Sequence, residues 1–217
     1  MRIPVIGVTG PIASGKTTVA RIVAGAGGAL VDCDALGARA LELPEVRRAI
    51  AAAFGDGVLG TGGCVSRRKL ARVVFASDGD LDRLNRIVRG PLTGIITREV
   101  MKQRRARARY IVLDAVLLFQ YKFRFKVDFT IATRASRTRR LARIMRRDGI
   151  SRREALERIE RQRALEGGWK RADVSLATDA PLARVRMEAA GIRDRFLADR
   201  HRTGRMTRCR TSSRAGR

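Results

Sequence analysis

The stretch RIPVIGVTGPIASGKTTVARIVAGA (residues 2–26) limits the possible folds more than any other part of this 217-residue chain. Its apolar start is short and β-branched, which predicts a buried strand, and residues 16–26 have the apolar spacing of a helix. Between them, residues 10–17 match G-x-x-x-x-G-K-[ST]. A strand, a glycine-rich turn and a helix in this order predict a loop that wraps a phosphate group.

The residue types of this loop suit that task. Gly10 and Gly15 leave out a Cβ atom where the backbone must approach an anion closely or take a positive φ. The N–H groups of the loop and of the helix N-terminus then point at the phosphate. Lys16 brings a charge to the outer phosphates, and the Thr17 hydroxyl binds Mg²⁺. We expect a nucleotide to be held by Gly10, Ile12, Ala13, Ser14, Gly15, Lys16, Thr17 and Thr18, with Thr17 as the metal ligand.

Strand and helix patterns alternate along the rest of the chain, which predicts an α/β fold with a mostly parallel sheet. Further strands are expected at 28–34, 110–119, 127–133 and 172–178, and helices at 35–55 (broken near Pro44), 67–76, 80–107, 134–147, 151–165 and 181–198. We expect residues 1–198 to form one domain with a helical insertion at about 45–108. Residues 199–217 are basic and have little to bury, which predicts a disordered tail.

The second strand ends in VDCD, so Asp32 and Asp34 share one face while the chain is extended. A kinase needs a carboxylate to accept the proton of the acceptor hydroxyl. Beside a phosphate-binding loop we favour Asp34 for this role. The alternative is that Asp34 caps a helix that begins at Ala35. Asp114, at the end of another strand, is expected to hold a Mg²⁺-bound water or to satisfy backbone N–H groups.

The chain carries 47 Lys and Arg against 21 Asp and Glu, a formal charge of +26. Such a charge fits nucleic-acid binding, but the arginines are spread over the whole chain and aromatic residues make up 5%. We therefore do not expect nucleic acid as a partner. No apolar run is long enough to span a membrane. The three cysteines lack metal-ligand spacing and suit a reducing cytoplasm.

Several motifs, in order, resemble dephospho-CoA kinases over about residues 3–198. They are GVTGPIASGKTTVA followed by LVDCDALGARAL, RRKLARVVFAS (67–77), YIVLDAVLLF (110–119), RLARIMRRDGISRREALERIERQ (140–162) and ADVSL (172–176). This set is far more specific than the phosphate-binding motif alone. It implies a P-loop NTPase core with a helical CoA-binding insertion and a helical lid at about 134–165.

The resemblance implies a cytoplasmic enzyme that moves the γ-phosphoryl group of ATP, with Mg²⁺, to the 3′-hydroxyl of dephospho-CoA. It implies Asp34 as the base and places Arg39 and Arg67 on the acceptor side. Arg143 and Arg147 fall on the lid positions that close over ATP, and their i, i+4 spacing puts them on one helix face. The catalytic set is therefore Lys16, Asp34 and Arg143. We expect a monomer.

The chain also departs from the family. Arg89-Gly90-Pro91 replaces a His-Pro pair, VLLFQ (116–120) replaces P-L-L-F-E, and Thr178 and Ala180 replace an Asn and a Gly near the adenine. A working but divergent kinase, a kinase with a shifted acceptor and a decaying copy all fit these changes, and we favour the first. Two functional alternatives stay open, a P-loop kinase of another nucleotide-like acceptor and a P-loop protein that binds nucleic acid.

Overall fold

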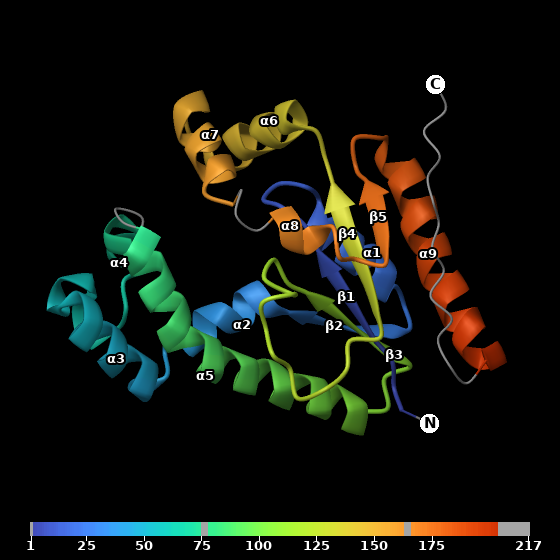
Figure 1. The fold of residues 1–217 in the computed structure, drawn as a ribbon, viewed down its shortest axis with the longest axis horizontal. Helices are drawn as coiled ribbons and strands as arrows, with labels where there is room; N and C mark the ends of the chain where they lie inside the picture. The colour runs from blue at the N-terminus through green and yellow to red at the C-terminus, as the bar shows by residue number, and fades with distance from the viewer. Residues whose placement is uncertain (1, 75–77, 163–165, 204–217) are drawn as a thin grey trace. The chain divides into compact units, whose positions relative to one another are not determined.

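The computed structural model describes residues 2–74, 78–162 and 166–203. The chain divides into two compact units (Figure 1). The first contains the chain up to Val31, Gln103–Gln120 and the chain from Phe125 onward, and the second contains Asp32–Lys102 and Tyr121–Arg124. The second unit begins before the expected insertion at 45–108. Within the described ranges, no helix is long and apolar enough to cross a membrane.

A five-stranded sheet in the order β2-β3-β1-β4-β5 forms the base of the first unit. The strands are β1 (Val5–Thr9), β2 (Gly28–Asp32), β3 (Tyr110–Asp114), β4 (Phe129–Arg134) and β5 (Val174–Ala177). β1 pairs in parallel with β3 and β4, and β4 pairs in parallel with β5. β1 and β3 are buried along their whole length, as expected where helices cover both faces of a parallel sheet. The predicted α/β fold is confirmed.

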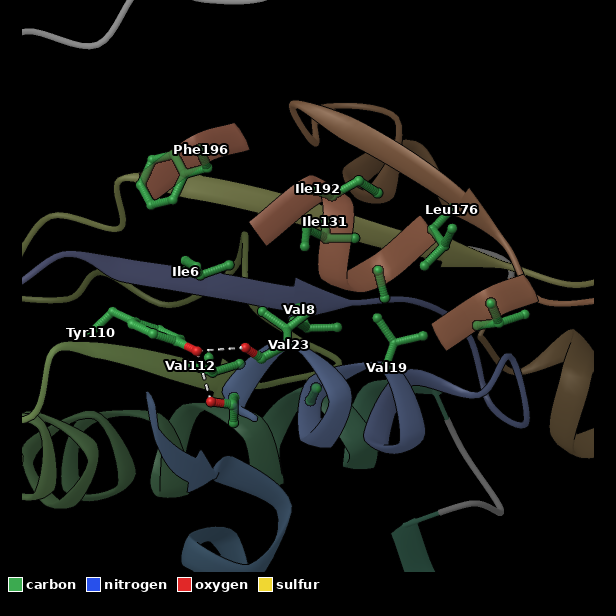
Figure 2. Close-up of a cluster of buried hydrophobic side chains, with 14 residues drawn as sticks. Ile6, Val8, Val19, Val23, Tyr110, Val112, Ile131, Leu176, Ile192 and Phe196 are labelled. Carbon is green, nitrogen blue, oxygen red and sulfur yellow. Dashed lines mark hydrogen bonds between the residues drawn. The ribbon is translucent and has the colours of Figure 1, made fainter. Parts of the chain in front are cut away.

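The helices of the first unit follow the strands. They are α1 (Lys16–Ala24), α6 (Arg137–Asp148), α7 (Arg152–Glu160), α8 (Glu166–Trp169) and α9 (Leu182–Thr203). Apolar side chains of α1 and α9 meet those of the strands in one core, where Val19 and Val23 lie near Ile192 and the sheet residues Val8 and Ile131 (Figure 2). This core fixes α1, and therefore the loop before it, against the sheet.

β3 is shorter than the predicted strand at 110–119, because the chain turns away after Asp114. The Thr9 hydroxyl donates to the carbonyl of Val116 at 3.0 Å. This hydrogen bond occupies a carbonyl group that a longer strand would use for pairing in the sheet. Leu118 folds into the core, where its Cδ1 would lie 3.1 Å from a Cβ added to Gly7. The prediction was wrong for 115–119 because an apolar run looks the same whether it continues a strand or turns inward.

The prediction of disorder after residue 198 was wrong for residues 199–203, because α9 continues to Thr203. Arg200 holds this end of the helix. Its guanidinium lies 3.1 Å from the buried carboxylate of Asp128, which also pairs with Arg2, and donates to the Arg2 carbonyl at 3.2 Å. Residues 204–217 lie outside the described residues.

The second unit is helical. It contains α2 (Cys33–Ala40), α3 (Pro44–Phe54), the 3₁₀ turns η1 (Asp56–Val58) and η2 (Thr61–Gly63), α4 (Arg67–Val74) and most of α5 (Asp78–Arg105). Its core gathers Val46 and Ile50 of α3, Val58 of η1, and Leu70 and Val74 of α4. It therefore has an apolar centre of its own.

A tyrosine closes the C-terminus of α1. The Tyr110 hydroxyl donates to the carbonyls of Ala24 at 2.7 Å and Val23 at 3.1 Å (Figure 2). Tyr110→Phe should lower the free energy of unfolding by about 1 kcal/mol, because two buried carbonyls lose their donor while the ring still fits. Urea denaturation measures this loss, and an unchanged midpoint at an unchanged m value would contradict the capping role.

Candidate active site

The loop between β1 and α1 has the geometry of a phosphate cradle. Gly10 has φ +144°, and a Cβ atom there would lie 2.7 Å from the Thr133 carbonyl oxygen, so a larger residue does not fit. Gly15 has φ +82°, and Ala13 also takes a positive φ of 60°. Within the described chain, no side chain caps the N-terminus of α1, which leaves its first N–H groups for an anion.

Three side chains hold the outer side of this loop through three consecutive carbonyl groups. Arg140 Nε donates to the carbonyl of Ile12 at 3.0 Å, and an Arg143 guanidinium nitrogen donates to that of Ala13 at 3.0 Å. The Thr178 hydroxyl donates to the carbonyl of Ser14 at 2.6 Å. With these carbonyl groups engaged, the loop is held in the conformation that turns its N–H groups inward.

The two helices of the predicted lid contact the same loop. The N–H group of Ile12 donates to Gln162 Oε1 at 2.6 Å, just after α7. Ile12 and Ala13 also pack against a small apolar cluster of α6 and α7 that includes Ile144, Ala155 and Ile159. The lid and the phosphate loop are thus joined by apolar contacts as well as by hydrogen bonds.

Lys16 and Asp114 form a buried ion pair at the base of the loop. Lys16 is 7% exposed and Asp114 is 1% exposed. Asp114 stands at the end of β3, beside β1, so parallel pairing brings its carboxylate under the lysine. Asp114 thus contacts the Lys16 ammonium group, a contact that the sequence did not predict, and its expected roles toward a Mg²⁺-bound water or backbone N–H groups stay predictions.

The structure treats the two predicted lid arginines differently. Arg143 reaches the loop and also donates to the Thr178 carbonyl at 2.7 Å. Burial, and then the charge of Arg139, lower the pKa of the Arg143 guanidinium. Arg147 is exposed and donates to both carboxylate oxygens of Asp148, at 2.7 and 3.0 Å. Among the described residues, Arg147 makes no hydrogen bond with the loop.

The remaining predicted site residues belong to the second unit. The helix begins at Cys33, two residues earlier than the predicted start at Ala35. Its N-cap is Asp32, whose carboxylate accepts from the Ala35 N–H group at 2.9 Å. The alternative in which Asp34 is the cap was therefore wrong, and Asp34 lies exposed in the first turn of α2.

Arg39 lies exposed in the last turn of α2, and Arg67 is the exposed first residue of α4. Five positions separate Asp34 from Arg39, about 140° around the helix axis, so the two side chains leave different faces of α2. The shared helix therefore does not by itself bring this acid and this arginine together.

Sequence reasoning missed several residues that shape the loop. Thr178 was assigned to the adenine surroundings, yet it is buried and joins the loop to Arg143. Arg140 was read as one of many lid arginines, although it is 6% exposed and bonded to the loop. Its place on α6, three residues before Arg143, was the available signal, because i and i+3 side chains are neighbours on a helix.

The comparison with known proteins agrees with the family that the motifs indicate. The model of the dephospho-CoA kinase family matches residues 4–184. A dephospho-CoA kinase of Bacillus licheniformis is 36% identical over 180 residues, which cover 82% of this chain and 89% of the relative. One of Arabidopsis thaliana is 33% identical over 179 residues, covering 82% and 77%. One of Geobacter metallireducens is 38% identical over 164 residues, covering 75% and 81%.

Solved structures agree at the level of the fold. The crystal structure of TT1252 from Thermus thermophilus has a TM-score of 0.69 and 32% identity, covering 92% of this chain and 98% of that one. A dephospho-CoA kinase from Campylobacter jejuni has a TM-score of 0.56 at 19% identity, with 88% and 96% covered. The second likeness shows the fold.

The buried ion pair predicts how Lys16 variants behave. Lys16→Met should lower the free energy of unfolding by about 3 kcal/mol, because it leaves the Asp114 charge buried without its partner. The double variant Lys16→Met/Asp114→Asn should recover most of that loss. Urea denaturation of both variants measures the difference. An undisturbed single variant would show that the pair does not stabilise the fold.

The contact between α6 and α7 predicts a pH dependence. Hydrogen bonding to Arg147, followed by the charges of Arg147 and Arg158, lowers the pKa of Asp148. A lowered pKa in the folded state stabilises the protein at pH values above the ordinary carboxyl pKa, and this stability is lost as the pH falls through the lowered pKa.

Asp148→Asn should therefore cost up to about 1 kcal/mol at pH 7. The gap to the wild type should narrow below about pH 4, where the carboxyl group gains its proton. Urea midpoints of both proteins between pH 7 and pH 3 check this, and a gap that stays constant over that range would contradict it.

Proposed function

The chain belongs to the dephospho-CoA kinase family, and from this we propose that it transfers the γ-phosphoryl group of ATP to the 3′-hydroxyl group of dephospho-CoA. The observation that carries the proposal is the cradle at residues 10–17, where an uncapped helix, two positive-φ glycines and a buried lysine are combined. Phosphoryl transfer depends mostly on such positioning and on positive charge.

On the nucleotide side, each loop residue has a defined task. Gly10 and Gly15 let the backbone wrap the phosphates, and the N–H groups at the start of α1 donate to them. The Lys16 ammonium group neutralises charge that develops on the transferred group. Arg143 holds the Ala13 carbonyl and brings its own positive charge to the edge of the loop. Ile12, Ser14 and Thr18 complete the proposed nucleotide site, and Arg147 is proposed to join it from the lid.

The donor set fits a magnesium ion. Thr17 is half-buried in the first turn of α1 and offers a hydroxyl oxygen, a ligand type that Mg²⁺ prefers. When bound, the ion neutralises charge on the β- and γ-phosphates. Thr17 would hold it, and the buried carboxylate of Asp114 keeps Lys16 in place beneath the loop.

On the acceptor side, we propose Asp34 as the base. Its carboxylate is exposed, and with the N-cap role belonging to Asp32 it is not needed to start the helix. It would accept the hydroxyl proton as the phosphoryl group arrives. Arg39 and Arg67 are proposed to contact the acceptor. We further propose that the enzyme acts as a monomer in the cytoplasm, where the thiols of Cys33 and Cys64 stay reduced.

A coupled ADP-release assay tests the function directly. The purified enzyme should consume ATP when dephospho-CoA is present and show little turnover with nucleoside monophosphates. Absence of turnover with dephospho-CoA, while ATP still binds, would overturn the proposal. Tight RNA binding that falls steeply with salt would instead favour a nucleic-acid role.

Asp34→Asn isolates the base. The variant should lower kcat by about 10²–10⁴-fold and leave the KM for ATP within about twofold, because the amide cannot accept the proton. Steady-state kinetics with each substrate varied in turn measures both values. Asp32→Asn is the matched control, since an amide oxygen still caps α2. Equal kcat losses in the two variants would contradict a special role for Asp34.

A further inference from the structure

A cavity of about 660 Å³ in the second unit is lined by five positively charged side chains. Arg86, Arg89 and Arg98 come from α5, and Lys122 and Arg124 come from the segment Tyr121–Arg124. Among the residues that the structure describes, no acidic side chain lines it. The lining includes Arg89-Gly90 and residues just after VLLFQ, where the sequence departs from the family motifs.

Within the part of the chain that the structure describes, these cations have no counterions. Among the described residues, none of the five forms an ion pair or a hydrogen bond, whereas Arg137, Arg147 and Arg158 of the lid all contact carboxylates. Like charges gathered around a hollow repel one another, and a concave shape concentrates their field. An anion in the cavity would relieve that repulsion.

The segment from Tyr121 to Arg124 is built to present its charges on one side. Its residues alternate between aromatic and cationic types. Tyr121 and Phe123 are half-buried with ring centroids 5.5 Å apart. Lys122 and Arg124 are exposed and line the cavity. The aromatic pair anchors the segment, and the two cations face the ligand space.

Small residues of α5 also line the cavity. Gly94 lies in the interior of the helix, where glycine is less favourable than alanine. A Cβ atom there would lie no closer than 3.8 Å to its nearest neighbour, an Arg98 nitrogen, so packing within the protein does not require a glycine. The missing side chain leaves room above the helix for a bound group.

A tyrosine links the cavity to the proposed catalytic base. Tyr121 is partly buried beside Cys33, Asp34 and Arg89, and burial, followed by the two acidic neighbours, raises the pKa of its hydroxyl. One tyrosine thus lies near both the proposed base and a cation of the cavity.

We propose that this cavity binds the diphosphate group of the acceptor, which in dephospho-CoA follows the ribose on its 5′ side. The inference rests on the proposed function. Arginine guanidinium groups bind phosphate oxygens in a bidentate manner, and several of them suit a group with two adjacent negative charges. Inorganic diphosphate shares this chemistry and serves as a probe.

The test compares two double variants that lose the same charge. Arg89→Gln/Lys122→Gln removes cations of the cavity. Arg48→Gln/Arg72→Gln removes exposed cations of α3 and α4 that do not line it. The cavity variant should raise the KM for dephospho-CoA about tenfold and leave the KM for ATP unchanged. The KM for dephospho-CoA should also rise less steeply with salt concentration than it does in the wild type. The control variant should leave both KM values within twofold.

A third variant fills the space without changing the charge. Gly94→Leu should raise the KM for dephospho-CoA and raise the melting temperature, because leucine favours the helix. In wild type at saturating ATP, inorganic diphosphate should compete with dephospho-CoA, and the cavity variant should lose this inhibition.

Equal effects of the cavity and control variants on the KM for dephospho-CoA would overturn the cavity assignment. The proposed function would still hold as long as the wild type turns over dephospho-CoA. Loss of inhibition by inorganic diphosphate with an unchanged KM for dephospho-CoA would also overturn it, since the cavity would then serve a free anion. Absence of wild-type turnover would point to failure of the function itself.

Discussion

The hydrogen bonds to the carbonyl groups of Ile12, Ala13 and Ser14 are the constraint on which the nucleotide site depends. A backbone loop can turn its N–H groups toward an anion only if its carbonyl groups find donors elsewhere. Here the donors come from α6 and from the residue after β5. The loop is therefore shaped by segments more than 100 positions away in the sequence, and the parallel sheet brings them together.

The same contacts give the lid helices a structural task. Arg140 and Arg143 are spaced three residues apart, so both reach the loop from one side of α6, while Arg147 turns to Asp148 at the junction with α7. The basic face of α6 is thus divided. One part supports the phosphate loop, and the other holds the two lid helices together through a carboxylate shared by Arg147 and Arg158.

Much of the fold could be predicted from local patterns. β1, the loop and α1 follow from an apolar run, a glycine spacing and a helical period. The end of β3 could not be predicted, because Leu118 turns into the core for a tertiary reason, its fit against Gly7. The end of α9 was missed for the same reason, since Arg200 is held by Asp128 from a distant part of the chain. Local polarity alone indicated disorder there.

At the site, sequence identified the residues that meet a phosphate but not those that support them. Lys16 is recognisable from its motif, whereas its contact with Asp114 depends on strand order. Asp32 and Asp34 were indistinguishable as cap and base until the first turn of α2 was known. A motif records what a ligand requires, and the supporting contacts depend on tertiary pairing.

The departures from the family motifs have a physical interpretation other than decay. Thr178 replaces an amide residue, yet its short side chain fits beneath Gly15 and donates to the loop. Arg89 replaces a histidine, and its guanidinium lines a hollow with other unpaired cations. A decaying site would lose polar contacts at random. Here two altered positions, Thr178 and Arg89, lie where a backbone carbonyl or an anion needs a donor, which favours a divergent enzyme over a decaying copy.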